Sequence, residues 1–308
     1  MSRIHEALKK AEIERGEAVT PAAVGAPEPE PDIVSPALAP PGGAPSESAR
    51  GGIAAAAFEP ITLDTIRKQC PTSQWSPDPH AVLFTELSGH THPAGAEEFR
   101  TLRSRLYAIR ERQPLQTVLV TSALPSEGKT FITLNLARAI AQQPQRSVLV
   151  IDADLRISRV HEGVGASVAP GLTDYLRGDV DALSVLQRGR DDNFFIIPGG
   201  SHDPNPVELL GTGRLRALIN RFAPVFDWII LDSPPCVFLA DSSLLGKVSD
   251  GVLMVVQSGV TPFDTAQKAC REFQEKQVVG VVLNRVPAGL TYGYYYYGYG
   301  TAQQPAKN

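Results

Sequence analysis

The sequence predicts an α/β fold in which a doubly wound, mostly parallel sheet is covered by helices on both faces. Short apolar runs alternate with helical patterns from residue 117 onward, and this alternation is typical of parallel sheets. The runs are nearly continuous in their hydrophobicity, so both faces of each strand are expected to be buried. The 308 residues, 43% of them hydrophobic, are enough to build such a core.

The individual elements are predicted from periodicity: apolar residues at spacings of three and four favour a helix, and continuous β-branched runs favour a strand. The expected strands cover residues 117–121, 147–151, 193–197, 228–231, 251–256 and 278–283. The expected helices cover residues 94–110, 129–142, 172–177, 180–187, 206–210, 214–222, 239–247 and 261–276. Residues 82–84 could form a further short strand before the first of these helices.

The two ends of the chain differ in composition from this region. Ile4, Leu8 and Ala11 form a narrow apolar stripe, which predicts either a short helix that needs a partner surface or a frayed terminus. The eight prolines between residues 20 and 52 predict a disordered linker, because such a stretch cannot bury enough apolar surface to offset its ordering entropy. The expected organisation is an N-terminal helix (1–17), a disordered linker (18–57), a poorly defined lead-in (58–93), the α/β domain (94–290) and a flexible tyrosine-rich tail (291–308).

Charge and cysteine content exclude several classes of protein. The formal net charge is −4, which argues against a nucleic-acid binder that relies on positive charge. Cys70, Cys236 and Cys270 form no zinc spacing and no disulfide framework, which fits a reducing compartment. No apolar run approaches the ~18 residues of a membrane span, and the N-terminus lacks a signal-peptide pattern. We therefore expect a cytoplasmic protein without direct membrane insertion.

A phosphate-binding loop is the strongest motif in the sequence. Residues 123–130, Ala-Leu-Pro-Ser-Glu-Gly-Lys-Thr, follow an apolar strand and open a helix, the context in which backbone N–H groups and a helix N-terminus bind phosphate. The residues expected to bind the nucleotide here are Ser126, Glu127, Gly128, Lys129 and Thr130. Lys129 would reach the β- and γ-phosphates, and the Thr130 hydroxyl would ligate Mg²⁺.

Acidic residues at the ends of two apolar strands support this site. Asp152 and Asp154 follow the expected strand 147–151, and Asp232 follows the expected strand 228–231. All three should therefore lie at the carboxyl edge of the sheet, where ligands of open α/β folds bind. Asp232 suits a Mg²⁺-water contact, while Asp152 and Asp154 could supply a base and a second metal contact. The alternative is that these aspartates only cap the following helices.

Asn284 and Arg285 stand at the end of the last expected strand, next to where a purine could sit. We expect them either to contact the base or simply to be solvated at the strand end.

Together these motifs resemble those of the bacterial tyrosine kinases (BY-kinases), which are cytoplasmic P-loop autokinases of polysaccharide export. The resemblance covers about residues 80–300 and rests on the phosphate loop and on the strand ends at 148–156 and 231–235. Three further segments are similar to family segments: a Glu-x-x-Arg-x-x-Arg helix, the run 204–210 and a tail rich in tyrosine. The helix residues are Glu97, Arg100 and Arg103, and the tail tyrosines are Tyr292, Tyr294, Tyr295, Tyr296, Tyr297 and Tyr299.

The resemblance implies a P-loop NTPase fold of the MinD/ParA type and an ATP- and Mg²⁺-dependent autokinase that phosphorylates its C-terminal tyrosines. It implies that Lys129 and Thr130 contact nucleotide and metal, that Asp152 is the base, and that Asp154 and Asp232 organise the metal. It also implies ring-like self-association through the Glu-x-x-Arg-x-x-Arg helix. The partners implied are further copies of the chain, a cognate tyrosine phosphatase, and a transmembrane chain-length regulator or polysaccharide co-polymerase that recruits the protein to the inner face of the cytoplasmic membrane.

Three positions bear on neighbouring families and on a second interpretation. Leu124 stands where ParA- and MinD-type ATPases have a signature lysine, and Cys236 is expected to be a small buried residue rather than the cluster ligand of an iron protein. Ser126 stands where BY-kinases usually have glycine, and an ordinary φ at this serine would alter the loop slightly. The alternative function is therefore an ATP-binding regulatory or scaffold protein with little kinase turnover.

Overall fold

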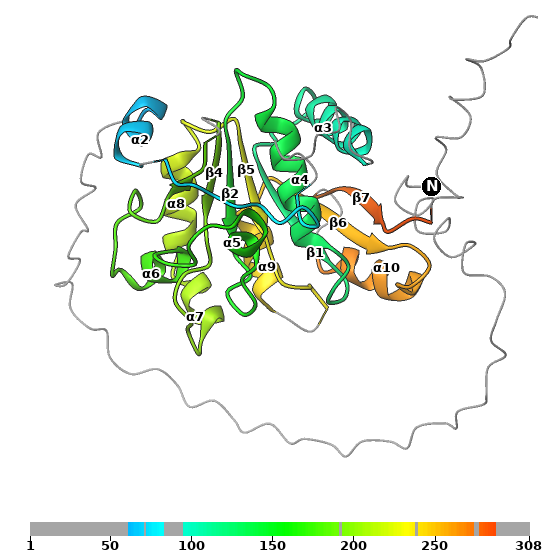
Figure 1. Ribbon diagram of the computed structural model, residues 1–308. Coiled ribbons are helices and arrows are strands. Elements are labelled where there is room, and N and C mark those ends of the chain that lie inside the picture. The colour runs from blue at the N-terminus through cyan, green and yellow to red at the C-terminus, as the bar shows by residue number, and fades with distance from the viewer. Residues whose placement is uncertain are drawn as a thin grey trace, which may run out of the picture. The chain divides into compact units, whose positions relative to one another are not determined.

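The computed structural model describes residues 61–70, 72–82, 95–190, 193–237, 240–273 and 277–287 (Figure 1). The N-terminal helix, the linker and the tyrosine-rich tail expected from the sequence lie outside these residues. Within them, no helix combines the length and the hydrophobicity needed to cross a membrane.

A sheet of seven strands, counted over the described residues, forms the centre of the domain (Figure 1). The strands are β1 (Thr117–Ser122), β2 (Val148–Asp152), β3 (Gln187–Arg188), β4 (Phe194–Ile197), β5 (Trp228–Asp232), β6 (Gly251–Gln257) and β7 (Val278–Asn284). Their spatial order is β3-β4-β2-β5-β1-β6-β7, and every neighbouring pair is parallel except β3 with β4. The doubly wound, mostly parallel sheet predicted from the sequence is confirmed.

Helices cover both faces of this sheet. They are α2 (Leu63–Gln69), α3 (Ala96–Arg110), α4 (Lys129–Ala141), α5 (Val160–Val164), α6 (Leu172–Arg177), α7 (Pro206–Gly211), α8 (Arg214–Phe222), α9 (Ala240–Lys247) and α10 (Phe263–Arg271). Val118 and Val120 of β1 pack in one core with Leu134 of α4, whereas Leu119 packs in the other core with Leu218 of α8. Because successive side chains of a strand point to opposite faces, these two cores bury both sides of β1, which explains why the strands are continuous apolar runs.

The expected helix over residues 180–187 is wrong. Asp181 accepts hydrogen bonds from the N–H groups of Leu183 and Ser184 at 2.7 and 3.0 Å, a local side-chain turn that competes with helix formation. The chain then enters β3, which runs antiparallel beside β4. The expected helix over 261–276 is also shorter, ending at Arg271.

The described part of the lead-in contains a helix that the sequence analysis did not predict. The Thr62 hydroxyl accepts the N–H of Thr65 at 3.2 Å and so caps α2, whose Ile66 is buried. Farther along, Trp75 meets Phe194 of β4 edge to face, with ring centroids 5.8 Å apart. Val82 is buried but belongs to no strand, and the rest of the possible strand over 82–84 lies outside the described residues.

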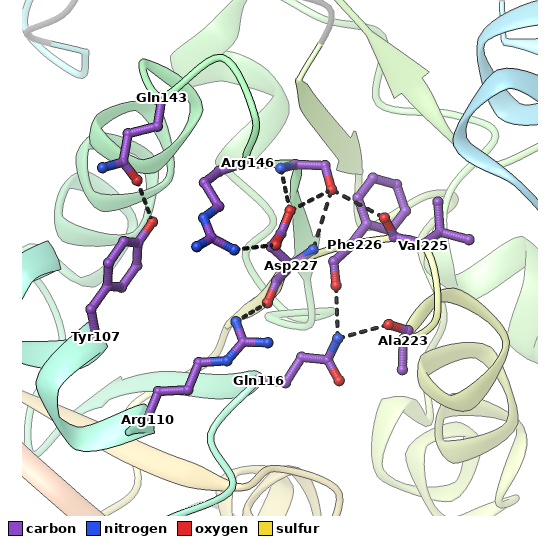
Figure 2. A network of polar contacts seen from close by, with 10 residues as sticks. Tyr107, Arg110, Gln116, Gln143, Arg146, Ala223, Val225, Phe226 and Asp227 are labelled. Carbon is purple, nitrogen blue, oxygen red and sulfur yellow. Dashed lines mark hydrogen bonds and ion pairs between the residues drawn. The ribbon is translucent and has the colours of Figure 1, made fainter. Parts of the chain in front are cut away.

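A polar network joins α3 to the amino ends of β2 and β5 (Figure 2). The Asp227 carboxylate accepts hydrogen bonds from the Arg146 side chain at 2.8 Å and from the Ser147 N–H at 2.9 Å. The Asp227 carbonyl accepts one from Arg110 of α3 at 2.6 Å. These contacts stabilise the amino-terminal ends of β2 and β5, at the opposite end of the strands from the phosphate loop.

Candidate active site

The phosphate loop follows β1 and turns into α4 through two residues in the left-handed region of backbone space. Gly128 has a φ of 95° and Ser126 a φ of 62°. A Cβ atom at Gly128 would lie 2.1 Å from the Asn284 amide nitrogen and would displace that side chain, and the left-handed φ itself favours glycine. The expectation of an ordinary φ at Ser126 is wrong. The loop keeps a turn that suits glycine, and serine adopts it at a cost of about 1 to 2 kcal/mol.

A buried carboxylate fixes the shape of this loop. Glu127 is 2% exposed and accepts hydrogen bonds from the N–H of Leu124 at 2.6 Å, from the N–H of Gln257 at 3.2 Å, and from the Thr261 hydroxyl. The Asn284 amide donates to the Glu127 carbonyl at 2.8 Å. Glu127 and Asn284 therefore hold the loop with their side chains, and the predicted base contact of Asn284 stays untested.

A cavity of about 400 Å³ opens beside the loop. It is lined by Pro125, Ser126, Gly128, Lys129, Thr130, Phe131, Asp154, Arg156, Ile157, Arg159, Pro234, Pro235 and Arg285. The structure thus brings together Lys129, Thr130, Asp154 and Arg285, which the sequence analysis singled out. Apart from Asp154, the charged side chains of the lining are basic, which suits a polyphosphate.

Two of these basic residues, Arg156 and Arg159, were not predicted from the sequence to have a role. Both lie in the loop after β2. Arg156 closes the run 148–156 on which the family resemblance rests, so its presence in that motif was the available signal. Arg159 offered no signal, because its place at the cavity depends on how the loop folds back.

Asp232 connects β5 to the first two turns of α4. Its two carboxylate oxygens accept hydrogen bonds from the Thr130 hydroxyl at 2.6 Å and the Thr133 hydroxyl at 3.0 Å. Burial raises the pKa of Asp232 to about 6, although these hydroxyl groups and the charge of Lys129 oppose that rise. A buried carboxylate beside a threonine hydroxyl is an arrangement that a cation would stabilise.

Asp152 pairs with Asp232 across β2 and β5 and is fully buried. One of its oxygens accepts the Ser158 hydroxyl at 2.7 Å and the N–H groups of Arg159 and Val160, both at 3.0 Å. Burial, and then the charge of Asp232, raise the pKa of Asp152 to about 8. The carboxylate thus caps the start of α5, as the alternative interpretation of the sequence expected, and it is not among the residues that line the cavity.

Asp154 faces the cavity and is the third carboxylate of the site. It accepts the Ile157 N–H at 3.0 Å, and burial raises its pKa. Asp154, Asp232 and the Thr130 hydroxyl present the oxygen ligands that Mg²⁺ prefers. The described residues contain no cluster of three or more His, Cys, Asp or Glu that could hold a metal by itself, so such an ion would also depend on the phosphates of the nucleotide.

The residues predicted for self-association lie on α3. Arg100 forms an ion pair with Glu97 one turn earlier, and their side chains are 27% and 73% exposed. Arg103 donates to the carbonyl of Ala139 in the last turns of α4. Arg103 therefore links two helices of the same chain, while an interface with a second copy stays a prediction.

Comparison with protein families gives one matching model. Residues 118–299 match the family described as the CobQ/CobB/MinD/ParA nucleotide binding domain. The match includes the phosphate loop and the strand ends that carry the three aspartates.

Curated proteins similar to this chain include tyrosine kinases. The tyrosine-protein kinase YwqD of Bacillus subtilis is 34% identical over 205 residues, which are 65% of this chain and 86% of YwqD. The tyrosine-protein kinase wzc of Salmonella typhimurium is 33% identical over 217 residues, which are 68% of this chain but 30% of that protein. The chain thus spans less than a third of the length of the second relative.

Solved structures resemble the fold over similar lengths. The kinase domain of the Escherichia coli tyrosine kinase ETK is 28% identical, with a TM-score of 0.60, and the match covers 69% of this chain and 90% of that domain. The chimerical protein CapA2B2 is 25% identical, with a TM-score of 0.62, and the match covers 73% of this chain and 100% of the other.

Proposed function

Because the chain belongs to the bacterial tyrosine kinases within the CobQ/CobB/MinD/ParA nucleotide-binding family, we propose that it is an ATP-dependent tyrosine autokinase that phosphorylates its own C-terminal tyrosine cluster. The observation that carries this proposal is the cavity where Lys129 and Thr130 of the phosphate loop meet Asp154. The tail supplies the acceptors: six of the eight tyrosines lie at positions 292–299. In this proposal one copy of the chain modifies the tail of another within an oligomer.

In the proposed reaction a tyrosine oxygen forms a bond to the γ-phosphorus of ATP, and the bond from that phosphorus to the β–γ bridging oxygen breaks. The bridging oxygen keeps the electron pair and leaves with ADP, while the tyrosine proton passes to a carboxylate. A tyrosine hydroxyl has a pKa of about 10, so a nearby base assists the attack. Lys129 and the loop N–H groups offset the charge of the phosphates.

We assign the base role to Asp152. Burial and the charge of Asp232 raise its pKa to about 8, so the carboxylate, once ionised, is basic enough to take up a tyrosine proton. Its carboxylate now receives hydrogen bonds from the loop after β2, so the role requires this loop to move when nucleotide and tyrosine bind. Asp154, Asp232 and Thr130 would hold Mg²⁺, which supplies charge neutralisation to the phosphates.

The decisive experiment is phosphotyrosine detection on the purified full chain, with Lys129→Met as the inactive variant. Lys129→Met removes a charge-assisted phosphate contact, and we expect phosphotyrosine formation to fall by roughly 10² to 10³. A variant with Phe at all six tail tyrosines should bind ATP normally and carry no phosphate. Mixing this tail variant with Lys129→Met tests transfer between copies, because only the Lys129→Met chains could then become labelled. Phosphotyrosine at wild-type level on Lys129→Met alone would refute the mechanism.

The physiological setting that we propose is polysaccharide polymerisation and export. The cytoplasmic part of a transmembrane chain-length regulator would recruit the chain to the inner face of the membrane and raise its turnover, and a cognate phosphatase would reset the tail. The alternative, a scaffold with little turnover, drew its support from an altered loop geometry at Ser126. The left-handed φ of this serine removes that support.

A further inference from the structure

An ion pair between Arg156 and Asp241, at the wall of the phosphate-loop cavity, takes no part in the proposed reaction. Arg156 donates from Nε to one Asp241 oxygen at 2.7 Å and from Nη2 to the other at 3.1 Å. The Asp241 side chain is 1% exposed and the Arg156 side chain 38% exposed. The buried carboxylate thus holds a guanidinium group that also lines the cavity.

The pair connects the loop that carries Asp154 to the helix that follows β5. Arg156 lies two residues after Asp154 in the loop after β2, and Asp241 lies in the first turn of α9, after the segment that follows Asp232. An Arg–carboxylate pair with two parallel hydrogen bonds fixes the plane of the guanidinium as well as its position. The carboxylate also lies at the amino end of a helix, where negative charge is favoured.

The guanidinium keeps donors for a ligand. Arginine carries five N–H donors, and Asp241 receives hydrogen bonds from two of its nitrogens. Among the described residues, Nη1 of Arg156 donates no hydrogen bond. Lys129 and Thr130 line the same cavity as Arg156, so all three can contribute donors to a ligand bound there.

We propose that Arg156 contacts the phosphoryl group during its transfer, and that Asp241 is the positioning residue that holds the Arg156 guanidinium toward it. The inference rests on the proposed kinase activity. Negative charge spreads over the three equatorial oxygens of the transferred group as the bond to ADP breaks and the bond to the tyrosine oxygen forms. A guanidinium held in place before the reaction stabilises that charge without reorganising.

Steady-state kinetics of the full chain test the first half of the proposal. Arg156→Gln should lower kcat for tail phosphorylation by about 10²-fold, while KM for ATP changes little. The matched control is Arg177→Gln: Arg177 also donates from Nε and Nη2 to a single aspartate, Asp203, but is not among the residues that line the cavity. This control should keep the wild-type kcat. A wild-type kcat in Arg156→Gln would overturn the proposal.

Binding of ADP with aluminium fluoride, a mimic of the transferred phosphoryl group, separates this inference from the kinase proposal. Arg156→Gln should bind ADP as the wild type does but lose affinity for ADP with aluminium fluoride by about tenfold or more. If the wild type formed no phosphotyrosine, the kinase proposal would fail. The binding of ADP with aluminium fluoride could still be measured and would test the role of Arg156 separately. Equal losses for the two ligands would mean that Arg156 supports only ground-state binding or the fold, which would contradict the inference.

A double-mutant comparison tests the role of Asp241. Asp241→Asn alone should lower kcat by about tenfold without changing KM, because it leaves Arg156 less well oriented. In an Arg156→Gln background the same change should have almost no further effect on kcat, since the group that it positions is absent. Independent effects of the two substitutions would show that Asp241 does not act through Arg156.

Discussion

At the scale of single residues, the site depends on carboxylates that are buried where their charge is costly. Asp152 and Asp232 are register partners on neighbouring parallel strands, and both have raised pKa values. Three backbone N–H groups and three hydroxyl groups stabilise them in part. The remaining cost is relieved by a proton or a metal ion, which couples the stability of the nucleotide-free protein to pH.

We predict that the free energy of unfolding of the nucleotide-free protein falls as pH rises from about 5 to about 9. The folded-state pKa values, about 8 for Asp152 and about 6 for Asp232, lie above the ordinary value near 3.9. The folded state therefore binds more protons than the unfolded state in this window. The stabilisation that these two groups contribute is fully present below the unfolded-state pKa. It is lost as the pH rises through their folded-state pKa values. Urea unfolding at several pH values measures the slope, which Asp152→Asn should flatten.

Asp203→Asn is the control for this series. The Asn205 N–H, and then Arg177, hold the pKa of Asp203 below its ordinary value, so this carboxylate affects stability only in the acid range. The variant should therefore keep the wild-type slope between about pH 5 and 9. A stability that is flat or rising with pH in the wild type would contradict the assignment of raised pKa values to the buried pair.

At the scale of elements, α3 is joined to the rest of the domain through its middle and its C-terminal end. Arg103 donates to the end of α4, and Arg110 donates to the Asp227 carbonyl before β5. Tyr107 stacks on Trp228 with ring centroids 5.3 Å apart. Glu97 and Arg100 precede these anchors, in the first turns of the helix, where a second copy could reach them.

We predict that Asp227→Asn destabilises the protein by about 1 to 3 kcal/mol at pH 7, because the Arg146 side chain loses a charged partner. Burial alone would raise the pKa of Asp227. Hydrogen bonds from the Ser147 N–H and from Arg146 outweigh this effect and hold the pKa below its ordinary value. Its contribution to stability is therefore present above the unfolded pKa and is lost as pH falls through the folded value. Urea unfolding should show a difference between wild type and variant that shrinks in acid, whereas the exposed control Asp264→Asn should show little difference. Equal stability of Asp227→Asn and wild type at pH 7 would contradict this account.

We predict that Arg100→Glu lowers self-association while leaving the unfolding free energy nearly unchanged, since the Arg100–Glu97 pair is partly exposed and worth little by itself. Arg103 is a poor probe because it also holds α4. Arg105→Glu, on the exposed side of the same helix, is the matched control for charge. Light scattering of the full chains measures the mass, and an unchanged mass for Arg100→Glu where the wild type oligomerises would rule out this interface.

At the scale of the whole molecule, we predict that the chain reaches a membrane through a partner rather than by binding lipid. No described helix is suited to cross a bilayer, and the net charge of −4 gives no general attraction to anionic lipid. Liposome flotation of the isolated protein should be negative, and strong flotation without a partner would refute recruitment. Deleting residues 1–55 should leave ATP binding intact and weaken association with the partner, because the helix expected from the sequence at the tethered N-terminus would raise local concentration without touching the nucleotide site.

The sequence by itself determined the parallel sheet, the phosphate loop and the group of aspartates at its edge. Continuous apolar strands followed by Asp152 and Asp232 predict one shared site, because the carboxyl ends of parallel strands meet at the same edge. The glycine-like turn at Ser126 was missed because a left-handed φ leaves no periodic signal in the sequence. The short edge strand β3 was missed because the side-chain turn at Asp181 that precedes it leaves none either.

Only the tertiary structure decided which groups each side chain meets. Arg156 and Asp241 are 85 residues apart, and Glu127 accepts from Thr261, 134 residues away. Such pairs depend on the order of strands in the sheet and on how the connecting loops fold back, and neither leaves a mark in local spacing. Burial then changes the chemistry of the groups brought together, because charge is costly away from water unless a partner compensates it. It raises the pKa of Asp152, and it favours the pairing of the buried Asp241 carboxylate with the Arg156 guanidinium.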